Sequence, residues 1–146
     1  MREAPVKSPH VLIVGCGDLG LRLGLQLMAE GWSVSAMRRR VDRLPEGFSP
    51  IAGDYTQPDD IAGLIDLQPD YVVFTPLPTA RDSAGYHQGY ALPVALMADL
   101  GLLSAVKGGI FVSSTRVFAQ TEGDWVDENS PLTQSDPQGV SIVEAE

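Results

Sequence analysis

The sequence contains little that supports a metal centre, a disulfide framework or a membrane anchor. It has one cysteine, Cys16, and two histidines, His10 and His87. One cysteine excludes a disulfide within the chain, and these three residues lack the spacing of a structural zinc site. No apolar run reaches the ~18 residues that a membrane helix needs, and the first ten residues lack the apolar stretch of a signal peptide. We therefore expect a cytoplasmic protein with no membrane partner and no metal.

Positive charge is also scarce. Ten basic side chains stand against nineteen acidic ones, which gives a formal net charge of −9. A chain of this charge repels polyanions, so we expect no nucleic-acid partner and any anionic ligand to be held locally. Its 146 residues, 44% of them hydrophobic and 20% charged, fit one globular domain spanning 1–146.

Short apolar runs alternate with helical patterns along the chain. We predict strands over 11–14, 32–37, 49–53, 71–74 and 110–112, and helices over 18–30, 58–65, 83–106 and from 140 onward. In the long helix, Pro93 predicts a kink and Gly108 and Gly109 predict the end. The pattern indicates a Rossmann-type α/β fold, a three-layer α/β/α sandwich with a parallel sheet of about five strands. No strand follows the last helix, so we interpret the chain as a truncated, N-terminal part of a longer domain.

A glycine-rich turn carries the clearest functional signal. Gly15, Gly17 and Gly20 form a G-x-G-x-x-G motif between the first predicted strand and the first predicted helix. In a dinucleotide site the first glycine permits the tight turn, the second lets the backbone approach a pyrophosphate, and the third lets helix and strand pack closely. The helix N-terminus, with Asp18 and Leu19, would add free amides and a partial positive charge. We predict cofactor binding here, with Cys16 as a small filler of the turn.

The second predicted strand runs into three arginines instead of the acidic residue that NAD-specific sites usually carry there. Arg38 and Arg39 are positioned to bind a ribose 2′-phosphate, which favours NADP, with NAD as the alternative. The competing interpretation is a solvated basic run, including Arg40, that pairs with the excess carboxylates.

Other candidate cofactor contacts follow the third and fourth predicted strands. Asp54 could accept from an adenine amino group, or it could cap a helix. Thr75 and Pro76 would lie at the carboxyl edge of the sheet, where open α/β folds bind their ligands.

Three segments together resemble the short-chain dehydrogenase/reductase superfamily, in particular its NAD-dependent epimerase/dehydratase group of extended and atypical members. They are VLIVGCGDLG near the start, GDYTQPDDI after the third strand, and SSTRVFAQTEGDWVDENSP after the fifth. The resemblance implies that Ser114 polarises a substrate hydroxyl or carbonyl, with Thr115 as its substitute. Phe118 stands where the family usually has tyrosine.

The Y-x-x-x-K pair on which that family's proton-coupled hydride transfer depends does not occur in this sequence. Two functions therefore stay open. One is an NAD(P)-dependent oxidoreductase or epimerase acting on a small hydroxyl or carbonyl compound such as a nucleotide sugar. The other is a non-catalytic dinucleotide-binding or sensor module. The long apolar helix over 83–106 further suggests a homodimer interface.

Overall fold

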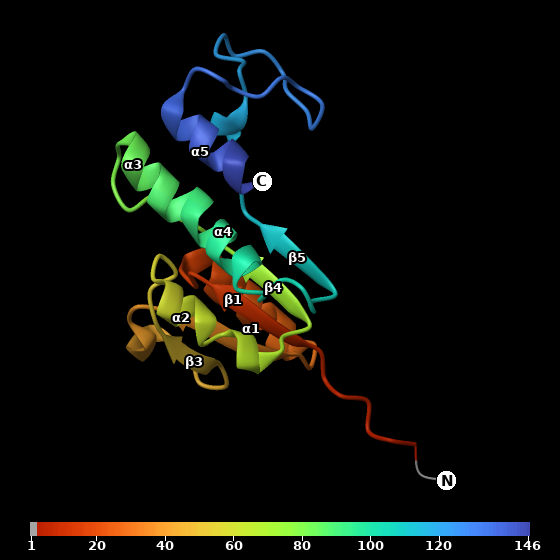
Figure 1. Cartoon of the computed structure of the whole chain (residues 1–146). Coiled ribbons are helices and arrows are strands. Elements are labelled where there is room, and N and C mark those ends of the chain that lie inside the picture. Colours follow the sequence, from red (N-terminus) through yellow and green to blue (C-terminus); the bar gives the residue numbers. More distant parts are fainter. Residues whose placement is uncertain (1–2) are drawn as a thin grey trace.

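The computed structural model describes residues 3–146 and contains an open, all-parallel sheet of five strands (Figure 1). The strands are β1 (His10–Val14), β2 (Ser33–Arg38), β3 (Ser49–Ala52), β4 (Tyr71–Phe74) and β5 (Gly108–Phe111). Their order across the sheet is β3-β2-β1-β4-β5. Val14, the last residue of β1, is in register with Met37 of β2 and Phe74 of β4. The central strands therefore end at one edge, and the parallel five-stranded sheet predicted from the sequence is confirmed.

The helices α1 (Asp18–Ala29), α2 (Pro58–Ala62) and α4 (Leu92–Asp99) cover the two faces of the sheet and complete the three layers. Two further helices, α3 (Ser83–Tyr86) and α5 (Pro137–Ala145), pack against each other. Successive residues of β1 face opposite sides, so Val11 and Ile13 pack under α1, whereas Leu12 and Val14 pack under α2 and α4. In Figure 1, α5 lies beside α3, away from the centre of the sheet.

Two glycines bring α1 close to the sheet. Gly20 and Gly24 are the buried residues of α1, whereas Leu19 is 55% exposed. A Cβ at Gly24 would lie 2.4 Å from the Phe48 ring. Gly31 has a φ of +88° and its amide bonds to the Met28 carbonyl, as expected of the glycine that ends this helix.

The long helix predicted over 83–106 is shorter and less regular than expected. It consists of α3, a π-helical turn over His87–Ala91 and α4, and the helix ends at Asp99. The predicted end at Gly108 was wrong, because Gly101 adopts a φ of +84° and stops the helix there. Pro93 is accommodated directly after the π-helical turn, at a helix position where its missing N–H breaks no regular bond.

The fifth strand begins earlier than predicted and has an exposed side. Gly108 and Gly109 belong to β5, in register with Tyr71 and Val72 of β4. The side chain of Ile110 is 61% exposed, since β5 forms an edge of the described sheet. The apolar residues of this segment therefore correctly predict a strand, but the strand is not buried.

An ion pair and a cation–π contact hold the C-terminal segment of the chain against the helix α3. The Arg116 guanidinium bonds to both carboxylate oxygens of Asp136, with Nε 2.7 Å from Oδ2, and its carbon lies 5.1 Å from the centre of the Tyr86 ring. The hydrogen bonds from Arg116 lower the pKa of the Asp136 carboxyl. Ile142 of α5 is fully buried beside Tyr90. These contacts position α5, whose predicted start at Val140 is three residues late.

Within residues 3–146, every helix is too short or too polar to cross a bilayer. The same residues contain no cluster of three metal-ligating side chains.

Candidate functional site

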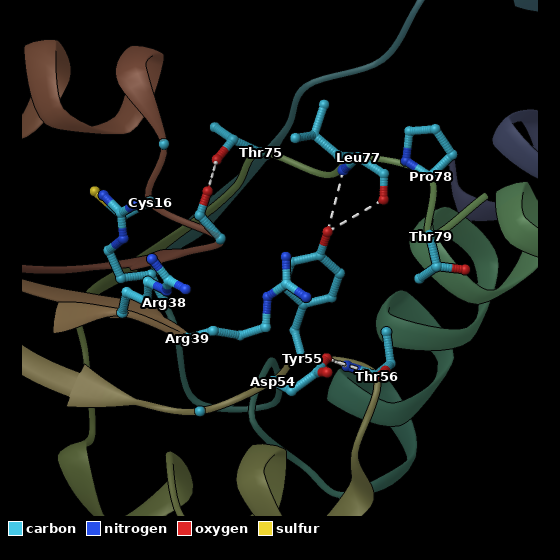
Figure 2. A pocket seen from close by; sticks show the side chains of 14 residues that line it. Cys16, Arg38, Arg39, Asp54, Tyr55, Thr56, Thr75, Leu77, Pro78 and Thr79 are labelled. Carbon is cyan, nitrogen blue, oxygen red and sulfur yellow. Dashed lines mark hydrogen bonds between the residues drawn. The ribbon is translucent and has the colours of Figure 1, made fainter. Parts of the chain in front are cut away.

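A cavity of about 620 Å³ opens at the carboxyl edge of the sheet. It is bounded by the turn after β1 and by the segments that follow β2, β3 and β4 (Figure 2). In the strand order β3-β2-β1-β4-β5, the chain adds β2 and β3 on one side of β1 and then β4 and β5 on its other side. The order in which strands are added therefore reverses at β1, although all five strands are parallel. Open α/β sheets bind ligands in the crevice at such a reversal.

The glycine turn is built so that two of its three glycines cannot be replaced without a clash. Gly15 has a φ of +79°, and a Cβ there would lie 2.9 Å from the Thr75 carbonyl oxygen. A Cβ at Gly20 would lie 2.9 Å from Cγ2 of Ile13 and 3.0 Å from Sγ of Cys16. The amides of Gly15 and Cys16 both bond to the Met37 carbonyl, which anchors the turn to the end of β2.

Gly17 differs from the other two because its missing side chain leaves open space. A Cβ there would meet no atom within 4 Å, and the residue lines the cavity. Beside it, the amides of Asp18, Leu19 and Gly20 have no acceptor among residues 3–146, since the first helical bond runs from Leu21 to the Gly17 carbonyl. The turn thus offers bare backbone and free N–H groups at a helix N-terminus, an arrangement suited to an anion.

Arginine side chains form the second wall. Arg38, Arg39 and Arg40 all line the cavity. Arg38 extends beside Cys16 and Arg39 toward Tyr55 (Figure 2). Within the described part of the chain none of the three lies within 4.0 Å of a carboxylate. The structure therefore does not support pairing of this basic run with the excess acidic residues.

The segment after β3 contributes Asp54 to the cavity wall. Oδ1 of Asp54 accepts from the Thr56 amide at 2.9 Å and from the Thr56 hydroxyl at 2.8 Å, and its own amide donates to Asp60 Oδ2. The residue that precedes α2 is Gln57, so Asp54 is not the N-cap of that helix. It organises the turn between β3 and α2.

Tyr55 is the main lining residue that the sequence analysis missed. Its hydroxyl accepts from the Leu77 amide at 3.1 Å and donates to the Leu77 carbonyl at 3.2 Å. Its ring contacts Phe74 edge-on, with the centroids 5.1 Å apart. Burial raises the pKa of this hydroxyl. Nothing in the local sequence signals the contact, because it joins residues 22 positions apart.

The predicted residue Thr75 also lines the cavity, and its hydroxyl donates to the Gly15 carbonyl at 2.7 Å. Cys16 is 1% exposed, and burial raises the pKa of its thiol, which opposes thiolate chemistry. Its position against Gly20 matches the filler role predicted for it.

The remaining predicted site residues lie outside this cavity lining. Asp18 forms an exposed ion pair with Arg22 at 3.0 Å, and Pro76 is buried. Ser114 precedes a 3-10 turn over Thr115–Val117, and its hydroxyl accepts from the Arg116 amide at 3.2 Å. The structure thus brings together the predicted cofactor residues Gly15, Gly17, Arg38, Arg39, Asp54 and Thr75, and it does not bring Ser114 or Thr115 among them.

The fold and the glycine turn define a Rossmann-type α/β protein, and comparison with known proteins narrows this class. A structure from Methylobacillus flagellatus, assigned as an NAD-dependent epimerase/dehydratase, is 31% identical with a TM-score of 0.76, over 95% of this chain and 49% of that one. The Bordetella bronchiseptica enzyme WbmH, solved in complex with NAD+, shares the fold at 18% identity, with a TM-score of 0.78 over 95% of this chain and 51% of that one.

Among curated proteins, Protein YeeZ of Escherichia coli K12 is 30% identical, over 93% of this chain and 51% of YeeZ. No model of a protein family matches the sequence. The chain spans about half the length of the relatives it matches. The resemblance to the short-chain dehydrogenase/reductase superfamily and its NAD-dependent epimerase/dehydratase group is confirmed.

Proposed function

We propose that this chain binds a nicotinamide dinucleotide, with the pyrophosphate on the turn from Gly15 to Gly20. The observation that carries the proposal is the contrast within the turn. Side chains at Gly15 and Gly20 would strike protein, whereas Gly17 borders open cavity beside three free amides. A cradle of bare backbone at a helix N-terminus fits a dianionic bridge, and it explains how a chain of net charge −9 can hold one. Solved neighbours that bind NAD+ support the same assignment.

The basic wall favours NADP over NAD. Arg38 and Arg39 line the cavity on the β2 side, where the adenosine ribose lies in folds of this kind, and guanidinium groups bind phosphate in bidentate fashion. The positions at the end of β2 and directly after it hold no acidic side chain to accept from a ribose 2′-hydroxyl, since residues 38–40 are all arginine. When bound, the cofactor would supply hydride transfer, and the chain's own residues would bind and orient it.

Calorimetric titration with NADP and NAD tests this preference. We expect NADP to bind at least about tenfold more tightly, because one charge-assisted bidentate contact contributes ~1.5–3 kcal/mol. Arg38→Ala should remove most of the preference while leaving NAD binding nearly unchanged. Arg43→Ala is the matched control, since Arg43 lies in the 3-10 turn over Val41–Arg43 and does not line the cavity. Equal affinities of the unmodified chain for the two dinucleotides would contradict the arginine argument.

We further propose that this chain belongs to a longer protein that is an oxidoreductase or epimerase acting on a small hydroxyl or carbonyl compound such as a nucleotide sugar. Structural neighbours that include a UDP-galactose 4-epimerase favour this activity. Ser114, with Thr115, stays the predicted substrate-polarising group, and a homodimer through residues 83–106 stays a prediction. The absence of a Y-x-x-x-K pair favours the second candidate, a non-catalytic dinucleotide sensor.

A further inference from the structure

Tyr55 connects two segments that leave the sheet on opposite sides of β1. It follows β3, on the side of the arginines, yet its hydroxyl makes two hydrogen bonds to the backbone of Leu77, which follows β4. One side chain thereby satisfies both the amide and the carbonyl of Leu77. Figure 2 shows the hydroxyl reaching across the cavity to this backbone.

Leu77 is also confined from the helical layer. A Cβ at Gly89, in the π-helical turn, would lie 2.1 Å from the Leu77 carbonyl oxygen and 2.7 Å from Cα of Pro78. The backbone of Leu77 is thus held between a tyrosine hydroxyl and a glycine, while its side chain is 70% exposed at the cavity.

The Tyr55 ring is itself fixed and cannot easily swing away. It packs against Phe74, and a Cβ on Gly15 would lie 3.0 Å from its Cε1 atom. Because burial raises the pKa of the hydroxyl, the group stays protonated at neutral pH and can donate and accept at once. The ring and hydroxyl of Tyr55 together form a rigid connection between the segment that follows β3 and the segment that follows β4.

We propose that Tyr55 is a positioning residue of the cofactor site, which holds the segment Thr75–Thr79 in place for the half of the dinucleotide beyond the adenosine. This inference rests on the proposed function. With the pyrophosphate at β1 and the 2′-phosphate at Arg38, the adenosine half occupies the β2–β3 side and the other half points toward β4. The Tyr55 hydroxyl acts only on the β4 side.

The test compares Tyr55→Phe with Tyr71→Phe. Tyr71 begins β4 at the opposite end of the strand, and its hydroxyl makes no hydrogen bond with residues 3–146, so it is a matched control. Each full chain is titrated by calorimetry with NADP and with adenosine 2′,5′-bisphosphate, which lacks the nicotinamide half. Hydrogen exchange of the Leu77 amide is measured without ligand.

For Tyr55→Phe we expect the Kd for NADP to rise by about threefold to about tenfold, the loss expected for one or two neutral hydrogen bonds. The Kd for adenosine 2′,5′-bisphosphate should stay within about twofold of the unmodified chain, and the Leu77 amide should exchange faster. Tyr71→Phe should change none of these values. Unchanged NADP affinity, or equal loss with both ligands, overturns this inference and leaves the proposed function standing. Failure of the unmodified chain to bind NADP overturns the proposed function and the inference with it.

Discussion

Replacing Gly17 with valine should raise the Kd for NADP at least about 100-fold, a loss of roughly 2.7 kcal/mol of binding free energy, while lowering the free energy of unfolding by no more than about 1 kcal/mol, because Gly17 is the N-cap of α1 and valine is a poor N-cap residue. A Cβ at this position would meet no protein atom within 4 Å, and the side chain would stand in the cavity, where the pyrophosphate must approach the backbone. The backbone at Gly17 is extended, with a φ of −92° outside the left-handed region that favours glycine, so folding should tolerate the change. Calorimetry with NADP and a thermal melt measure the two effects.

Gly20→Ala is the control, because this substitution in the same turn should lower the stability of the chain more than its affinity for NADP. The added Cβ would press against Ile13 and Cys16, and overpacking of this kind costs about 1–3 kcal/mol of unfolding free energy. A Gly17→Val chain that binds NADP like the unmodified protein would show that the pyrophosphate does not rest on this turn.

Gly89→Ala should lower the free energy of unfolding by about 3 kcal/mol. The added carbon would lie 2.1 Å from a backbone oxygen of Leu77, and backbone cannot rotate away as the end of a flexible side chain can. Since Leu77 lines the cavity, the relief of this clash should also displace the wall and weaken NADP binding.

Urea denaturation of Gly89→Ala and Gly63→Ala separates this clash from the general effect of adding a methyl group. Gly63 has a φ of −63°, and a Cβ there would come no nearer than 3.5 Å to its neighbours. Alanine should therefore stabilise the chain by about 0.4–1 kcal/mol through the unfolded state. Equal stabilities of the two variants would refute the close approach of the π-helical turn to Leu77.

The sequence predicted the elements whose signals are local. Tyr71–Phe74 was predicted with its observed bounds, because its unbroken apolar run suits a strand buried on both faces. The prediction of the long helix was wrong at its C-terminal end, because the sequence alone does not distinguish Gly101 from Gly108. In the fold, Gly101 has a left-handed backbone that ends the helix, whereas Gly108 begins β5. In α1, Leu19 lies exposed because Gly20 and Gly24 are the residues that face the sheet.

Motif spacing was sufficient to predict those site residues that follow neighbouring strands of the sheet. The glycine turn and the arginines after β2 border one cavity, because both follow neighbouring parallel strands. Tyr55 was missed because its role depends on a contact with Leu77 that only the packed sheet creates. The structure also resolves one alternative that spacing left open, since Asp54 organises a turn and does not cap α2.

The most direct test follows the backbone amides of a ¹⁵N-labelled chain while NADP is added. If the pyrophosphate rests on the helix N-terminus, the amide resonances of Gly17, Asp18, Leu19 and Gly20 should show the largest shifts, and those of the exposed strand β5 should stay in place. Saturating NADP that leaves these four amides unshifted would contradict the account.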